Sequence, residues 1–122
     1  MTDLIKTEYL IISPEDSHWE KVKRDIVEWP REPGYDKIEK VVKPLVMGDF
    51  EQVSVLFSRM GGPEAPADMF VNDIGALSGK FPINPLGTWV YHTFSRLKQP
   101  KAWLGAPPIF GPAVLFMRRV WY

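Results

Sequence analysis

The chain has no cysteine among its 122 residues and only two histidines. Without cysteine it cannot contain a disulfide framework, a thiolate nucleophile or a zinc ribbon. Fifteen Lys and Arg residues balance fifteen Asp and Glu residues, so the formal net charge at pH 7 is zero. Proteins that bind duplex nucleic acid mainly through its phosphates carry a clear excess of positive charge, which this chain lacks.

Long hydrophobic runs are also missing. The apolar run nearest the N-terminus covers only residues 9–12 and has acidic residues around it, unlike a secretory signal or a membrane span. We therefore expect a cytoplasmic protein with no membrane partner. A chain of this length can bury one apolar core, so we expect a single domain over residues 1–122.

Short periodic segments separated by turn-forming residues make up the rest of the chain. Strands are predicted at residues 9–12, 50–58, 68–71 and 113–117, and the last, wholly apolar, is expected in the middle of the sheet. Helices are predicted at residues 14–29, from 35 to about 43, and from 85 onward. The order β-α-α-β-β-α-β indicates an α+β domain. It should have a mainly antiparallel sheet of about four strands, with about three helices packed on one face.

The predictions for two of the helices depend on particular residues. The second carries Pro44, which removes a hydrogen bond and predicts a kink or an end near Lys43. The first carries an apolar residue every three or four positions, at Trp19, Val22, Ile26 and Trp29.

The segment VNDIGALSGKFPINPLGTW, residues 71–89, joins a predicted hairpin strand to the third helix. Its glycines can supply backbone with positive φ, and we interpret Asn72 as closing an Asx-turn and Asn84 as capping the helix. A phosphate cradle is the alternative, because backbone amides near a helix start can hold an anion. The segment lacks Gly-Lys-Ser/Thr and the spacing of a dinucleotide fingerprint, which favours the structural role.

This segment also carries a resemblance to a known family. A strand ends in an Asn-acid pair and continues through a glycine turn to Pro-x-Asn and a helix, and a later glycine precedes the last strand. In this form residues 35–116 resemble the domain-of-unknown-function 3846-like family of small phage and plasmid proteins. Where that family has Gly-Gly before the first hairpin strand, this chain has Met47-Gly48-Asp49. The resemblance implies a mobile-element context and no particular reaction. The matching positions are Asn72, Asp73, Gly75, Leu77, Gly79, Phe81, Pro82 and Asn84, with Gly111 or Gly105 as the later glycine.

Patterns of catalytic or metal-binding residues are not found in the sequence. The carboxylates are scattered without acid/base or metal spacing. His18 and His92 fall on different predicted helices, and helical geometry predicts that His92 faces solvent. We therefore expect no catalytic residues, no metal, no cofactor and no enzymatic activity. An enzyme would require a structure that brings Asp73, Asn84 and His92 into one pocket.

Five tryptophans are many for this length, and three of them lie late in the chain among cationic residues. Such a set can pack in a core, anchor a protein interface or stack the bases of a single strand. We expect a non-catalytic binding protein of a phage or other mobile element, which acts on a host protein or sequesters a small ligand. The alternative is a single-stranded nucleic-acid-binding protein that uses the basic and aromatic C-terminal third. The candidate binding residues are Asn72, Asp73, Asn84, Trp89, His92, Trp103, Arg118 and Arg119.

Overall fold

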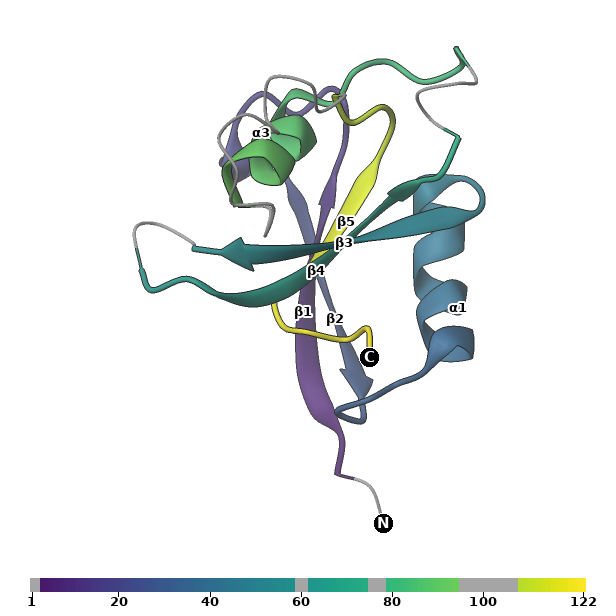
Figure 1. The fold of residues 1–122 in the computed structure, drawn as a ribbon, viewed down its shortest axis with the longest axis vertical. Coiled ribbons are helices and arrows are strands. Elements are labelled where there is room, and N and C mark those ends of the chain that lie inside the picture. Colours follow the sequence, from purple (N-terminus) through teal and green to yellow (C-terminus); the bar gives the residue numbers. More distant parts are fainter. Residues whose placement is uncertain (1–2, 59–61, 75–78, 95–107) are drawn as a thin grey trace.

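Alternating apolar and polar residues produce a five-stranded sheet in which all neighbouring strands run antiparallel (Figure 1). The computed structural model describes residues 3–58, 62–74, 79–94 and 108–122. Over these ranges the α+β class is as predicted, with five strands and two α-helices in place of about four and three. The elements are β1 (Ile5–Ile12), the 3₁₀ turn η1 (Trp19–Lys21), β2 (Lys23–Trp29), α1 (Tyr35–Val46), β3 (Phe50–Phe57), β4 (Ala65–Asn72), α3 (Pro85–Phe94) and β5 (Ala113–Phe116).

The order of strands in the sheet is β2-β1-β5-β4-β3, so the wholly apolar strand β5 lies at its centre, as predicted. All four residues of β5 are buried. Strands β3 and β4 form the expected hairpin, paired from Phe50↔Asn72 to Phe57↔Ala65. Strand β4 is longer than predicted because this pairing continues to Ala65, beyond the apolar residues from which the prediction was made.

The two helices cover opposite faces of the sheet, which corrects the prediction that all helices pack on one face (Figure 1). Helix α1 places Ile38, Val42 and Val46, four residues apart, in the core on one face. Helix α3 places Val90 in the core on the other. Both faces need cover because successive residues of the central strand point to opposite faces and are all apolar.

The predicted helix over residues 14–29 is wrong. This stretch forms a turn, η1 and strand β2, which pairs with nearly the whole of β1. Val22 joins the core on the α3 face, whereas Trp29 joins the core on the α1 face and stacks on Phe116 with ring centroids 5.1 Å apart. A division between two faces fits a strand and excludes a single helical stripe. Pairing and burial against β1 therefore override the local spacing of apolar residues.

Helix α1 continues to Val46, beyond the predicted end near Lys43, and Pro44 lies in its last turn. The complete burial of Val46 favours the additional residues. Met47 then adopts the left-handed conformation, with φ of 65°. The Gly48 N–H donates to the Lys43 carbonyl at 3.1 Å, which closes the end of the helix.

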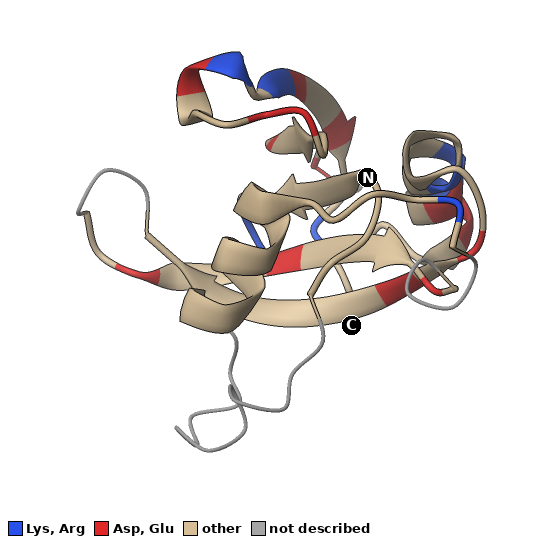
Figure 2. Cartoon of the chain, turned by 90° about the horizontal axis from the view of Figure 1, so that it is seen from above, with Lys and Arg blue, Asp and Glu red and all other residues tan. Residues whose placement is uncertain are grey.

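Charge is unevenly distributed over the elements, since β2 and α1 carry many charged residues and α3 carries none (Figure 2). Strand β2 lies at an edge of the sheet, where charged side chains discourage pairing with another chain. The one ion pair in the described ranges joins Lys43 Nζ to Asp49 Oδ1 at 3.2 Å. None of the helices in these ranges has the length and apolar character to cross a bilayer.

Candidate ligand-binding groove

Asn84 joins three segments of the chain at the start of α3. Its side chain is completely buried, and its Oδ1 accepts the N–H of Gly87 at 2.9 Å, which confirms the predicted helix cap. Its Nδ2 donates to the carbonyls of Ile12, at 2.8 Å, and Gly111, at 2.9 Å. Both amide hydrogens are therefore engaged inside the protein, where they hold the end of β1 and the approach to β5 against the helix.

Asn72 closes the predicted Asx-turn, because its Oδ1 accepts the N–H of Ile74 at 3.0 Å. Its Nδ2 donates to the carbonyl of Val46 at 3.0 Å and so ties the end of β4 to the end of α1. Asp73 is exposed and lines a small pocket of about 190 Å³ beside Asn72.

Two glycines of the predicted motif have the backbone conformation expected of them. Gly79 has φ of +67° and Gly111 has φ of +81°. At Gly111 space is also restricted, because a Cβ there would lie 3.0 Å from Cδ1 of Phe81. Both positions support a role in directing the backbone. The motif positions Gly75, Leu77 and Gly105 lie outside the described residues.

His92 is half-buried, which corrects the prediction that it faces solvent. Its Nε2 is buried and has no hydrogen-bond partner in the described part of the chain. The prediction was made from the helical angle between His92 and buried Val90, whereas the helix also has a contact beside His92: Thr88, four residues earlier, accepts the N–H of Ile109 at its Oγ1 at 2.8 Å. The pocket that contains Asp73 is lined by neither Asn84 nor His92. The described residues also include no group of three or more Asp, Glu or His side chains able to hold a metal ion.

Arg118 uses its guanidinium inside the protein. Its Nε donates to Thr7 Oγ1, its Nη1 to the carbonyl of Arg31 and its Nη2 to the carbonyl of Pro30, each at 2.9 Å. Burial lowers the pKa of Arg118 from its ordinary value. The neighbouring Arg119 is exposed, and its guanidinium lies 4.6 Å from the centroid of the Tyr122 ring. Trp103, another of the predicted binding residues, lies outside the described residues.

Asp68 is a buried carboxylate that the sequence did not single out. It is 2% exposed, and its Oδ2 accepts the backbone N–H groups of Val120 and Trp121, both at 2.8 Å. Its Oδ1 accepts Nε2 of Gln52 at 2.7 Å. This carboxylate therefore fastens the C-terminal segment to β4. This role could not be predicted from the sequence, because Val120 lies 52 residues away along the chain.

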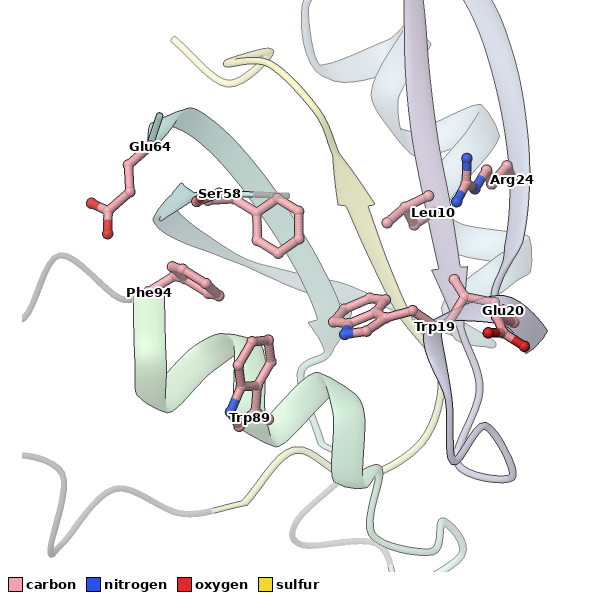
Figure 3. A pocket seen from close by; sticks show the side chains of 10 residues that line it. Leu10, Trp19, Glu20, Arg24, Ser58, Glu64, Trp89 and Phe94 are labelled. Atoms are coloured by element: carbon pink, nitrogen blue, oxygen red, sulfur yellow. The ribbon is translucent and has the colours of Figure 1, made fainter. Parts of the chain in front are cut away.

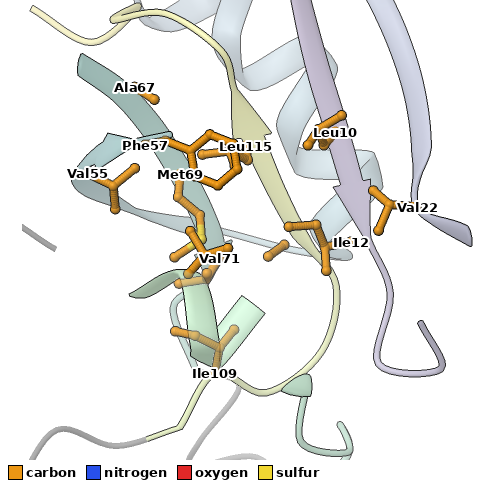
Figure 4. Close-up of a cluster of buried hydrophobic side chains, with 12 residues drawn as sticks. Leu10, Ile12, Val22, Val55, Phe57, Ala67, Met69, Val71, Ile109 and Leu115 are labelled. Carbon is orange, nitrogen blue, oxygen red and sulfur yellow. The ribbon is translucent and has the colours of Figure 1, made fainter. Parts of the chain in front are cut away.

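A groove of about 700 Å³ lies on the α3 face of the sheet, between α3 and the η1–β2 segment (Figure 3). Leu10 of β1 and Phe57 of β3 belong to its floor, on the same sheet face as the other core residues of this side (Figure 4). Trp89 and Phe94 of α3 form one wall, and Trp19 of η1 stands opposite.

Four aromatic rings of the groove form a closed cycle of contacts, which we call the aromatic box. Trp19 contacts Phe57 and Trp89, with 6.0 Å between ring centroids in both pairs. Phe94 contacts Phe57 at 5.1 Å and Trp89 at 5.3 Å. Successive ring planes are inclined by 60° to 85°, the steep inclinations that aromatic pairs prefer. All four rings line the groove, and Trp89 is still 47% exposed.

Three charged side chains also line the groove. Figure 3 shows Glu20 beyond Trp19 and Glu64 beyond Phe94, at opposite ends of the aromatic box. Arg24 of β2 lies across from Leu10 in the β1–β2 register. None of the three belongs to an ion pair within the described ranges. The groove thus combines an aromatic interior with a charged rim.

Of the predicted binding residues that the structure describes, only Trp89 lines this groove. Trp19, Phe57 and Phe94 were assigned to the buried sides of predicted helices and strands. The high tryptophan content was the one sign of a site in the sequence. It could not show which rings meet, because the rings belong to three separate elements, and about 75 residues of chain separate the first, Trp19, from the last, Phe94.

Fold and groove together define an α+β domain with an antiparallel five-stranded sheet, a helix on each face and one aromatic groove beside the second helix. Comparison of the chain with protein-family models, with curated proteins and with solved structures found no match in any of the three. The resemblance to the domain-of-unknown-function 3846-like family stays a prediction.

Proposed function

We propose that this chain is a non-catalytic binding protein that holds a small ligand in the aromatic groove. The observation that carries the proposal is the groove itself, whose volume of about 700 Å³ falls within the range usual for small-molecule sites. Such sites have mainly apolar and aromatic walls with a few polar groups, as this one has. The polar candidates Asn72, Asn84 and Arg118 make hydrogen bonds within the protein, which favours aromatic contact over polar chemistry.

The family resemblance would place this protein in a phage or another mobile element, in the cytoplasm of the host cell. There a host protein is the other expected partner. A partner protein would use the same groove by inserting an apolar side chain, since exposed aromatic surface with a polar rim is also typical of interfaces.

Single-stranded nucleic acid remains the alternative partner. That proposal depended on cations of the C-terminal third, and Arg118 directs its donors to other parts of the protein. Tryptophan fluorescence measured during titration with an oligonucleotide, at two salt concentrations, tests it. An unchanged signal would remove nucleic acid from consideration.

The test of the groove is a ligand screen with two matched variants. Binding of aromatic and aliphatic compounds is followed by amide chemical shifts and by thermal unfolding. Compounds that bind should shift residues of η1 and α3, and Trp89→Ala should abolish their binding. Tyr122→Ala, which removes a ring of similar exposure far from the groove, should leave binding unchanged. Failure of every compound to shift these residues, or equal binding by Trp89→Ala, would contradict the proposal.

A further inference from the structure

We infer that the ligand of this groove carries a methylated ammonium group, and that the aromatic box holds that group. The inference rests on the proposed function and narrows it to one class of ligand. Cations are attracted to the negative faces of aromatic rings, and a cage of several rings is a known way to recognise quaternary ammonium groups. The box offers two tryptophans, the best rings for this purpose, and two phenylalanines.

The geometry of the box suits a rounded cation. Centroids of neighbouring rings are 5.1 to 6.0 Å apart, and each ring plane is steeply inclined to the next. A group seated among the rings would lie within the approximate 6 Å over which the attraction acts.

Among the described residues, no cation of the protein lies over the rings of the box. Arg24 is the one cationic side chain that these residues contribute to the groove, and the one guanidinium that they place over a ring is that of Arg119, over Tyr122. Arg24 lies on the β2 side, across from Leu10.

The charges at the rim favour a cation over an anion or a neutral ligand. Glu20 and Glu64 stand at opposite ends of the groove and Arg24 on its β2 side, so the described residues of the lining carry one excess negative charge. The two carboxylates have no ion-pair partner among the described residues. Their attraction for a ligand would be moderate, because both are exposed and screened by salt.

The shortage of hydrogen-bond acceptors in the ring walls of the box, between the carboxylates at its two ends, favours a methylated over an ordinary ammonium. An ordinary ammonium has three donors, and losing their hydration without replacement is costly. The walls of the box are carbon apart from the two indole N–H groups, which are donors. A quaternary ammonium needs no acceptor and loses little on entering such a space.

The deciding experiment compares choline with 3,3-dimethylbutan-1-ol, which has the same shape and no charge. Tetramethylammonium is the third probe. Binding is measured by titration calorimetry and by the upfield shift that aromatic rings impose on the methyl protons of the probe. Both cations should bind, and the neutral alcohol should bind about three- to thirtyfold more weakly.

Substitutions separate the contribution of the aromatic box to binding from that of the charged rim. Trp89→Ala should abolish the upfield shift, and Trp89→Phe should retain part of it. Glu64→Gln should weaken binding of both cations about twofold and leave the neutral alcohol unchanged. Glu32→Gln, an exposed carboxylate that does not line the groove, is the matched control and should have no effect.

The outcomes distinguish the inference about a cationic ligand from the proposed function, small-ligand binding in the groove, on which it rests. Equal affinity for choline and the neutral alcohol would overturn the cation inference and leave the apolar groove in place. Absence of binding by all three probes would also overturn it, whereas the wider compound screen would still decide the proposed function. If that screen fails too, both are wrong.

Discussion

Replacing Gly87 by alanine should destabilise this protein, although the same change in a helix usually stabilises by about 0.5 to 1 kcal/mol. A Cβ at Gly87 would lie 3.0 Å from Cγ and 3.1 Å from Oδ1 of Asn84. That amide cannot move aside easily, because three hydrogen bonds of 2.8 to 2.9 Å hold it. We expect crowding of this kind to lower the free energy of unfolding by about 2 kcal/mol.

The sign of the effect should reverse when Asn84 is removed. Asn84→Ala alone should cost about 3 kcal/mol, since three side-chain hydrogen bonds are lost at about 1 kcal/mol each. In that background Gly87→Ala no longer meets an obstacle and should recover about 0.5 to 1 kcal/mol. The two sites should therefore show an interaction energy of about 2 to 3 kcal/mol in a double-mutant cycle.

Urea unfolding followed by far-UV circular dichroism measures all four proteins, with equal slopes expected for each. Thr93→Ala, at an exposed position of the same helix, is the control and should stabilise by a few tenths of a kcal/mol. If Asn84→Ala does not fold, Asn84→Ser replaces it, because serine keeps a capping oxygen and occupies less space. A neutral or stabilising Gly87→Ala in the otherwise unchanged protein would refute the reasoning.

Three further predictions concern stability. Asp68→Asn should lower the free energy of unfolding by about 2 kcal/mol, because one of the two acceptor oxygens, which bind Gln52 and the C-terminal segment, becomes a donor; unchanged urea midpoints would contradict this. Burial, followed by the charge and hydrogen bond of Asp25, raises the pKa of Tyr9. The stability that neutral Tyr9 contributes is fully present below pH about 10, the ordinary pKa of tyrosine. It is lost as the pH rises from there through the higher pKa of Tyr9 in the folded protein. Tyr9→Phe should therefore show a smaller alkaline loss in thermal scans, and an identical loss would count against it. Gly111→Ala should cost about 1 to 3 kcal/mol, since φ is +81° and its Cβ would meet the ring of Phe81 at 3.0 Å; a cost below about 0.5 kcal/mol would show that the backbone adapts.

The sequence alone determined those features whose cause is local. Alternation along residues 50–57 gave strand β3, and the apolar run at 113–116 placed β5 at the centre of the sheet. The caps and turns at Asn72 and Asn84 also followed, because each needs only residues two or three positions away.

The tertiary structure decided everything that depends on a distant partner. Residues 23–29 carry helical spacing yet form a strand, because β1 offers a complete ladder of hydrogen bonds. The role of Asp68 in holding the C-terminal segment could be recognised only from the tertiary structure, in which that segment lies beside the carboxylate. The aromatic groove has the same origin, since Trp19 and Trp89 meet at 6.0 Å only because η1 and α3 lie on one face of the sheet. Periodicity reports which side of an element is apolar, and only packing decides which elements meet there.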